Sequence, residues 1–326
     1  MDFKKIVQQN TILVVKTGSH LYGTNGPESD EDFVGIYFPP EESVFGFLKA
    51  DEIDMSIHSK DERGKNTKDA IDIKYYDFRK FVKLALENNP NILEILFAND
   101  KNIVFINDFG KELLDMKSRF PWVGLKNKFL GYAFSQKHKM IIKRNNYFDL
   151  VKALDFLNFA GAEFSLWEIQ GAMDKSIFQV KKNSVNNSVD FYQVGDINFM
   201  PSISVKRARK MIQERLDKVG NREELYLKHA YDTKFAMHLV RLMYEGLELL
   251  KTGKLEFPLA KEELDVLRKI RNGEFPVEYI FEISSELEKL LEAMSKDHLF
   301  LPSKPRFDEI QSYTISAMKK WYKEQI

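Results

Sequence analysis

The sequence contains no cysteine among its 326 residues. A disulfide framework, a zinc site built on thiolates and a cysteine nucleophile are therefore excluded, which leaves oxygen and imidazole groups to carry any chemistry. Net charge is absent as well, because 49 Lys and Arg balance 49 Asp and Glu. The overall field of the protein gives no attraction to nucleic acid or membrane, so a site for a polyanion must be a local patch.

Long apolar runs are also missing. No stretch approaches the ~18 apolar residues of a membrane span, and residues 1–10 lack the apolar region of a signal peptide. We therefore expect a cytoplasmic protein with no membrane partner. The 44% of hydrophobic and 30% of charged residues, with 26 Phe and 13 Tyr, are typical of a folded globular protein. The length predicts about two domains.

Strand patterns dominate the first third of the chain. Runs rich in β-branched and aromatic residues predict three strands, at residues 11–17 (TILVVKT), 32–38 (DFVGIYF) and 70–76 (AIDIKYY). Apolar spacing predicts helices over residues 78–86 and 92–97. The polar stretch 59–68 predicts a loop. This part of the chain is therefore expected to be an α/β (α+β) domain with a mixed sheet.

Helical periodicity replaces the strand patterns after about residue 115. Apolar spacing predicts helices over residues 129–142, 149–169, 230–250, 261–270, 277–294 and 307–322. Residues 178–202 interrupt this run and predict a loop or a hairpin. We place the domain boundary at the change of pattern, which gives a catalytic-type domain over residues 1–115 and an all-α domain over residues 116–326.

Acidic residues gather where the predicted strands begin. Asp30 and Asp32 are two positions apart, so a strand presents both carboxylates on one face. Asp72 joins them if its strand pairs beside that of Asp32. Three converging carboxylates repel one another unless cations lie among them, and hard oxygen ligands favour Mg²⁺ or Mn²⁺. Two such ions ~3.5 to 4 Å apart would support nucleotidyl transfer, an in-line displacement of pyrophosphate.

The turn after the first strand carries Gly18 and Ser19. Gly18 lets the backbone approach a triphosphate, and the amide and hydroxyl of Ser19 offer hydrogen bonds to phosphate oxygens. A D-x-D pair at a strand start is, by itself, more often a solvated turn. Four fixed positions recur by chance on the order of once per 10⁵ starting points, so the combined spacing favours a nucleotide site.

The stretch GSHLYGTNGPESDEDFVGI, residues 18–36, resembles the G-S…S-D-x-D signature of nucleotidyltransferases of the DNA polymerase beta superfamily. It is similar in particular to the branch of bacterial and phage nucleotidyltransferases associated with RNA repair. Further segments resemble that branch, at residues 77–97, 229–253, 270–274 and 300–305. The resemblance implies the fold and the metal chemistry of the superfamily.

The resemblance also implies roles for individual residues. The metals, two Mg²⁺ or Mn²⁺ ions, are expected on Asp30, Asp32 and Asp72, which are the predicted catalytic residues. Asp69 lies on the same short segment and is the alternative third carboxylate. The nucleotide-binding loop is expected to comprise Gly18, Ser19, His20, Tyr22 and Gly23. His20 and Tyr22 could instead only order this loop.

Basic side chains in the helical part form a second set of candidates. Nine basic residues, counting one His, and no acid lie between Lys117 and Phe148. Such a helix can follow a phosphate backbone, although a basic helix face is more often simply solvated. Two sets of residues are predicted to bind the acceptor or the triphosphate. The first is Lys137 and Arg144, which are seven positions apart and share a helix face. The second is Lys234, His238 and Arg241, which with Tyr231 line one stripe of the predicted helix 230–250.

These observations predict a metal-dependent nucleotidyltransferase that uses an NTP such as ATP and transfers its nucleotide to an RNA end, for example that of a tRNA. Two alternatives stay open. The acceptor of an AMPylation-type transfer could be a protein or a small molecule. A non-catalytic nucleotide-binding module could keep the fold, but intact Asp30 and Asp32 argue against it, because a degenerate site would be expected to lose carboxylates that repel each other.

Overall fold

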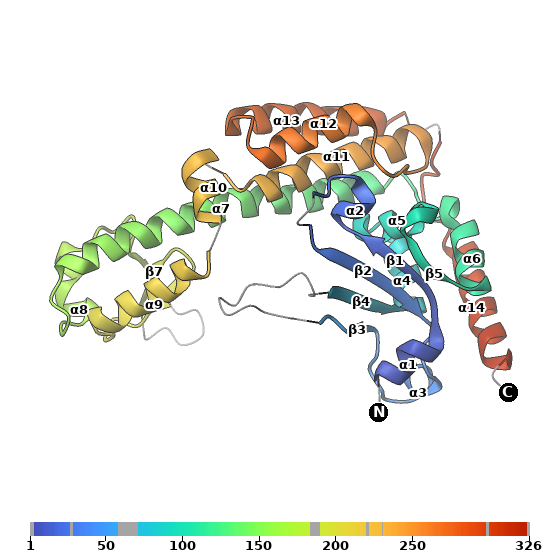
Figure 1. The fold of residues 1–326 in the computed structure, drawn as a ribbon, viewed down its shortest axis with the longest axis horizontal. Coiled ribbons are helices and arrows are strands. Elements are labelled where there is room, and N and C mark those ends of the chain that lie inside the picture. The colour runs from blue at the N-terminus through green and yellow to red at the C-terminus, as the bar shows by residue number, and fades with distance from the viewer. Residues whose placement is uncertain are drawn as a thin grey trace. The chain divides into compact units, whose positions relative to one another are not determined.

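The computed structural model describes residues 3–26, 29–57, 71–182, 190–219, 222–229, 231–297 and 300–324. Its N-terminal part holds a five-stranded sheet in the order β3-β4-β2-β1-β5 (Figure 1). The strands are β1 (Thr11–Thr17), β2 (Glu31–Tyr37), β3 (Glu52–Asp54), β4 (Ile71–Asp77) and β5 (Ile103–Ile106). β2 and β4 run parallel and the other pairs are antiparallel. The predicted mixed sheet is confirmed, and the predicted loop 59–68 lies outside the described residues.

β1 lies inside the sheet, because it pairs with β2 on one side and β5 on the other. Ile12, Leu13, Val14 and Val15 are all buried. A strand covered on both faces needs such a continuous apolar, β-branched run rather than alternation. β1 therefore gives the turn at its end a rigid support.

Short helices connect and cover the strands. They are α1 (Phe3–Asn10), α2 (Ser19–Tyr22), α3 (Glu41–Val44), α4 (Phe78–Leu86), α5 (Pro90–Leu96) and α6 (Asp108–Asp115), with single 3₁₀ turns at Asp100–Asn102 and Lys117–Arg119. The second predicted helix begins at Pro90 rather than at residue 92. Proline suits the first position of a helix, where its missing N–H has no intrahelical partner.

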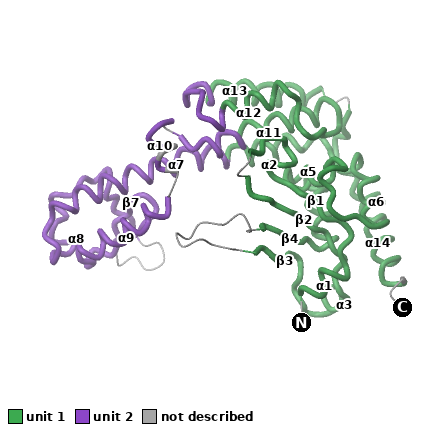
Figure 2. The backbone as a smooth tube through the Cα atoms, viewed as in Figure 1, with its two compact units in different colours: residues 1–134, 239–269, 281–326 green, residues 135–238, 270–280 purple. Residues whose placement is uncertain are grey.

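The chain forms two compact units (Figure 2). The first comprises residues 1–134, 239–269 and 281–326, and the second comprises residues 135–238 and 270–280. This grouping follows contacts in space, and both units use segments from before and after residue 200. The predicted domains 1–115 and 116–326 stay a prediction about the chain's organisation.

An aromatic cluster forms part of the first unit's core. The ring of Phe38 lies 4.6 Å from that of Phe78, 5.2 Å from that of Phe109 and 4.7 Å from that of Trp321. Trp321 belongs to α14 (Phe307–Glu324), which also packs against α4. The C-terminal helix therefore supports the sheet that carries the acidic residues.

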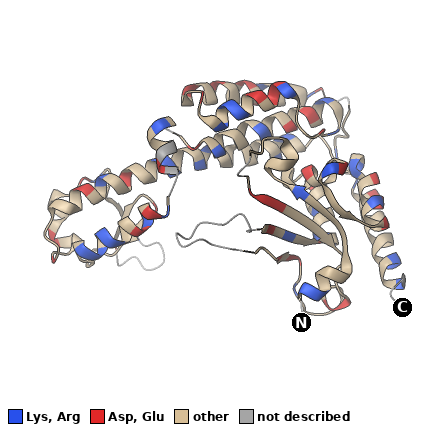
Figure 3. Cartoon of the chain, viewed as in Figure 1, with Lys and Arg blue, Asp and Glu red and all other residues tan. Residues whose placement is uncertain are grey.

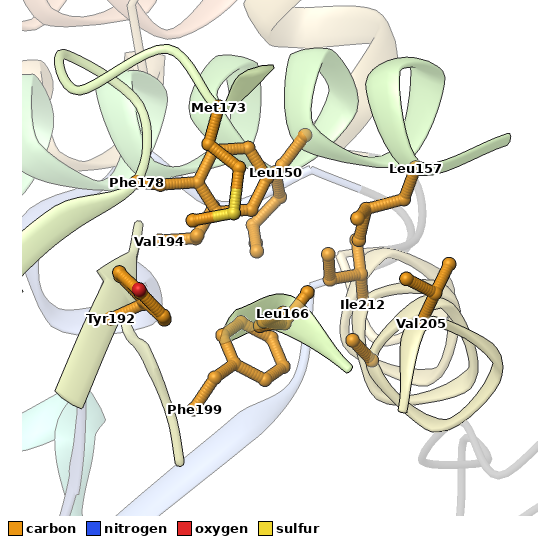
Figure 4. Close-up of a cluster of buried hydrophobic side chains, with 12 residues drawn as sticks. Leu150, Leu157, Leu166, Met173, Phe178, Tyr192, Val194, Phe199, Val205 and Ile212 are labelled. Atoms are coloured by element: carbon orange, nitrogen blue, oxygen red, sulfur yellow. The ribbon is translucent and has the colours of Figure 1, made fainter. Parts of the chain in front are cut away.

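The second unit is largely helical and has its own core (Figure 4). Its elements include most of α7 (Leu125–Phe159), then α8 (Leu166–Ile169), a 3₁₀ turn at Gln170–Ala172, β6 (Gln179–Lys181), β7 (Phe191–Val194), β8 (Ile197–Phe199), α9 (Val205–Asp217) and α10 (Arg222–His229). Leu150 and Leu157 of α7 meet Phe178, Phe199 and Ile212 in this core. The three strands form a small antiparallel sheet within the segment where a loop or hairpin is predicted.

The predicted helices 129–142 and 149–169 are wrong as separate elements, because α7 runs without interruption from Leu125 to Phe159. The intervening residues Lys143 to Phe148 contain neither Gly nor Pro, so nothing in them breaks a helix. The remaining helices are α11 (Thr233–Thr252), α12 (Lys261–Asn272) and α13 (Val277–Met294). Among the described residues, no helix combines the length and the apolar character that crossing a membrane requires.

Candidate active site at the strand ends

Two of the predicted metal ligands lie directly opposite each other on neighbouring strands. Asp32 of β2 is the register partner of Asp72 of β4 in the parallel pair. Side chains of register partners stand on the same face of a sheet, so both carboxylates are presented on one side. Asp30 is exposed, immediately precedes β2, and falls on that side if the strand's alternation extends to it. The pairing that the sequence analysis required for Asp72 is therefore present.

The carboxylate of Asp32 packs against the turn that carries Gly18. Gly18 has φ 64° and ψ −144°, a backbone conformation that residues with a Cβ rarely adopt. A Cβ placed on Gly18 would lie 2.5 Å from Oδ2 of Asp32. Glycine is therefore required at this position for two reasons: the backbone angle, and the short distance to the Asp32 carboxylate. The sheet thus brings Asp32, Asp72 and the Gly18-Ser19 turn together.

Gly18→Ala is expected to lower the free energy of unfolding by about 1–3 kcal/mol, the usual cost of a strained backbone conformation. Gly26→Ala is the matched control, because a Cβ on Gly26 meets no atom within 4 Å. Urea unfolding of both variants, followed by circular dichroism, measures the difference. Equal stabilities of the two variants would contradict the close packing of Asp32 on the turn.

The backbone of the turn closes on itself through a short helix. The amides of Leu21 and Tyr22 donate to the carbonyl of Gly18, and the amides of Gly23 and Thr24 donate to that of Ser19. Gly23 ends α2 in the left-handed conformation, with φ 83°. Its carbonyl accepts a hydrogen bond of 2.8 Å from Nη2 of Arg268. The α12 residue Arg268 therefore helps to hold the end of the predicted nucleotide-binding loop.

His20 lies half-buried on the same turn. Among the described residues, its buried Nε2 atom has no hydrogen-bond partner. A buried polar atom usually has one, so a ligand that reaches this nitrogen would gain a hydrogen bond. This placement is compatible with the predicted contact between His20 and a nucleotide, which stays a prediction.

Glu31, between the two predicted ligands, belongs to the other face of β2. Its carboxylate binds Nζ of Lys16 at 2.6 Å, and Lys16 pairs in register with Phe33. The hydrogen bond from Lys16 lowers the pKa of Glu31 below its ordinary value. The alternation of the strand therefore separates Glu31 from Asp32 and makes it a suitable control position.

Tyr22 and Arg241 lie in a buried cluster beneath the turn rather than on its surface. The Tyr22 hydroxyl donates to Glu94 Oε2 at 2.6 Å, and the Arg241 guanidinium lies 3.9 Å from the centre of the Tyr22 ring. Arg241 also pairs with Glu94 and with Glu245, the latter at 2.6 Å. Arg241, Glu94 and Glu245 are at most 3% exposed. We call these four residues the buried charge cluster.

The buried charge cluster contains two carboxyl groups and one guanidinium. Burial is the largest influence on the pKa of Glu245 and raises it well above its ordinary value, and the nearby Glu94 raises it further. Burial also raises the pKa of Tyr22, whose hydroxyl therefore remains a hydrogen-bond donor. Tyr22 and Arg241 thus contact each other. The contact of Tyr22 with a nucleotide, and that of Arg241 with the acceptor or the triphosphate, stay predictions.

The other predicted acceptor-binding residues belong to the second unit. Lys234 is exposed, whereas Lys137, Arg144 and His238 are half-buried. The Arg144 guanidinium lies 5.1 Å from the centre of the Phe148 ring. Tyr231, the first member of the predicted stripe with Lys234, His238 and Arg241, is buried, and its hydroxyl donates to the Phe275 carbonyl. Contact between these residues and the strand ends stays a prediction.

The strand ends offer the donor atoms that a divalent cation requires. Asp32 and Asp72 supply hard carboxylate oxygens in register, which suits Mg²⁺ or Mn²⁺. Within the described part of the chain, no three Asp, Glu, His or Cys side chains already form a metal-binding group. The alternative ligand Asp69 lies outside the described residues. The set Asp30, Asp32 and Asp72 fits the expected ions in chemistry and stays a prediction.

Sequence patterns did not identify Glu94 and Glu245 as partners of Arg241. One signal was present, since Arg241 and Glu245 are four apart on one helix. Glu94 is a single acid within the apolar run NILEILF, and such an acid is either exposed or buried with a partner. Its partner is 147 positions away in sequence, which local patterns do not reveal.

Comparison with known proteins adds three findings. Residues 1–159 match the model of the RNA repair pathway DNA polymerase beta family. An uncharacterised 38.9 kDa protein from the nrdC–mobD intergenic region of Enterobacteria phage T4 is 27% identical over 308 residues, covering 88% of this chain and 90% of the phage protein. A nucleotidyltransferase-like protein from Exiguobacterium sibiricum 255-15, known from a crystal structure, aligns with 91% of this chain and 78% of its own, at 10% identity and a TM-score of 0.27. The family match includes the whole five-stranded sheet and all of α7.

Proposed function

Because residues 1–159 match the model of the RNA repair pathway DNA polymerase beta family, we propose that the chain transfers a nucleoside monophosphate from an NTP to an acceptor hydroxyl. One observation carries the proposal. Asp32 and Asp72 are register partners on parallel strands, and the Gly18 turn packs against Asp32. Carboxylates beside a glycine turn suit the binding of a metal-associated triphosphate.

Asp30, Asp32 and Asp72 would hold two Mg²⁺ or Mn²⁺ ions. When bound, such ions lower the pKa of an attacking hydroxyl and neutralise charge on a departing pyrophosphate. The protein's part is to fix the carboxylates, which the register of β2 and β4 supports for Asp32 and Asp72. Rigid strands are suitable supports, because small displacements of catalytic groups reduce rates strongly.

In the proposed reaction, the acceptor oxygen forms a bond to the α-phosphorus of the NTP. The bond from that phosphorus to the oxygen bridging to the β-phosphate breaks, and pyrophosphate leaves with the bonding electrons. The acceptor's proton passes to solvent. Gly18 and Ser19 would lie against the triphosphate, with His20 and Gly23 completing the loop, and backbone amides there would donate to phosphate oxygens.

We take the acceptor to be an RNA end, for example that of a tRNA. The family's association with RNA repair and the basic stretch between Lys117 and Phe148 support this choice. Lys137, Arg144, Lys234 and His238 are the proposed contacts for the acceptor or the triphosphate. Arg241 is assigned to the same role by sequence, and its burial makes an indirect effect through the turn the simpler expectation.

Transfer of label from each of the four α-labelled NTPs, with Mg²⁺ or Mn²⁺, tests the proposal. RNA, protein and small-molecule acceptors are assayed in parallel, and label is expected on RNA. Label on protein or on a small molecule would support an AMPylation-type reaction instead. Undiminished transfer by the Asp30→Ala/Asp32→Ala variant would refute the assignment of the carboxylates, and absence of transfer to every acceptor would favour a binding module.

A further inference from the structure

A pocket of about 290 Å³ lies within the second unit, between α7, α9 and α10. Every described residue that lines it belongs to this unit. Its volume is close to the lower end of the range for small-molecule sites, ~300–1,000 Å³. None of the roles proposed above uses this pocket.

The rim of the pocket is basic. Lys139 and Lys143 reach it from α7, and Lys218 follows α9. Asp196 is the one acid among the described lining residues, and Arg215 binds its carboxylate with hydrogen bonds of 2.6 and 3.0 Å. Basic residues also outnumber acidic residues along α7 and α9 (Figure 3). The positive charge of the pocket is therefore a local feature in a protein with no net charge.

The floor of the pocket is apolar and aromatic. Leu150 of α7 and the rings of Tyr147 and Tyr226, whose centres lie 5.5 Å apart, are buried, and Ile142 of α7 adds a partly exposed apolar side chain to the lining. The Tyr147 hydroxyl donates to Glu223 Oε1 at 2.7 Å, and burial raises the pKa of Tyr147 to about 12, so the ring stays neutral. An apolar floor beneath a cationic rim is complementary to a molecule with a flat ring and a phosphate group.

We propose that this pocket binds one nucleoside phosphate unit, with the base or sugar on Ile142 and Tyr147 and the phosphate among Lys139, Lys143 and Lys218. The unit belongs either to an RNA strand or to a free nucleotide, which share this chemistry. Lys137 and Arg144 are not among the residues that line the pocket, so it differs from the acceptor or triphosphate site predicted from sequence. Binding to this pocket does not depend on the proposed reaction, because it is measured without turnover.

Equilibrium binding to the full chain tests the proposal, in buffer with EDTA so that no transfer occurs. The probes are a short single-stranded RNA, measured by fluorescence anisotropy, and ATP, measured by calorimetry. The pocket variant is Lys139→Gln/Lys143→Gln/Lys218→Gln. The control variant, Lys206→Gln/Arg207→Gln/Lys210→Gln, removes the same charge from exposed positions of α9 that do not line the pocket.

The pocket variant is expected to bind at least about tenfold more weakly than wild type, because it can no longer form charge-assisted hydrogen bonds to phosphate. The control variant should stay within about twofold. With RNA as the probe, the affinity of the pocket variant should also depend less steeply on salt, by ~0.7 in slope for each phosphate that is no longer neutralised. Circular dichroism checks that all variants are folded.

A second variant separates the pocket from general electrostatic attraction. Ile142→Trp keeps every charge and enlarges an apolar lining residue that is 38% exposed, so it should weaken binding without unfolding the helix. Weakened binding of RNA alone identifies the ligand as a strand, and weakened binding of ATP identifies a free nucleotide. The proposal is overturned if wild type binds neither probe, if the pocket and control variants bind alike, or if Ile142→Trp binds like wild type.

Discussion

Replacing Asp72 by Asn is expected to reduce nucleotidyl transfer on the order of 10²- to 10³-fold, as does removal of one preorganised electrostatic contact in other enzymes. Asp32→Asn should have an effect of the same size, because the two residues are register partners on β2 and β4. The substitution keeps the shape of the side chain and removes the negative charge that would bind a cation. Initial rates of label transfer, measured at saturating Mg²⁺, give the ratio.

Two control variants make this prediction specific. Glu31→Gln changes a carboxyl group on the opposite face of β2, where it binds Lys16, and should leave the rate within about twofold. Asp69→Asn tests the alternative third carboxylate. Titration of each variant with Mn²⁺ by calorimetry should show weaker binding for Asp32→Asn and Asp72→Asn. If Asp69→Asn loses activity while Asp72→Asn keeps it, the third ligand is Asp69.

Much of the candidate site could be predicted because its geometry depends on short-range rules. The period of two along a strand separates Glu31 from Asp32. The apolar run of β1 ends at a glycine, and the structure gives Gly18 the positive φ that only glycine adopts readily. What sequence alone left open was which strand lies beside β2. The parallel pairing with β4 depends on contacts across more than 30 residues, which no local pattern encodes.

The parts that were missed are those that depend on distant partners. β5 has the burial pattern of a half-exposed edge strand and only four residues, so its signal in the sequence is weak. The three short strands of the second unit are similar in this respect. α7 was divided in two because apolar spacing weakens around Asn145 and Asn146, although neither residue breaks a helix. Packing of Leu150, Ala153 and Leu157 in the second unit's core supports the C-terminal part of α7.

The buried charge cluster beneath the turn also depends on distant partners, and it gives the strongest prediction about stability. Arg241 is the one cation among Tyr22, Glu94 and Glu245, and its guanidinium contacts all three. Removing it leaves two carboxyl groups in an interior where Glu245 is fully buried. Removing one partner of a buried ion pair lowers the free energy of unfolding by about 3–5 kcal/mol, because the remaining charge has neither water nor a partner.

Arg241→Met is therefore expected to lower the free energy of unfolding at pH 8 by about 3–5 kcal/mol. Lys111→Met is the matched control, since Lys111 pairs with Asp108 on the surface, where solvent screens the pair, and its loss should change the stability little. Burial raises the pKa of Glu245 in the folded state, so folding binds protons and becomes more favourable as the pH falls toward the unfolded value. The loss in Arg241→Met should accordingly shrink at pH 5.5, where the stranded carboxyl groups take up protons.

The triple variant Glu94→Gln/Arg241→Met/Glu245→Gln removes every charge from the cluster and should recover part of the loss, because no unpaired ion remains buried. Urea unfolding at pH 5.5 and pH 8 measures all three variants. Since Tyr22 ends α2, the helix that begins at Ser19, Arg241→Met should also weaken NTP binding, although Arg241 is only 3% exposed. If Arg241→Met is as stable as Lys111→Met at both pH values, the buried charge cluster does not hold the turn.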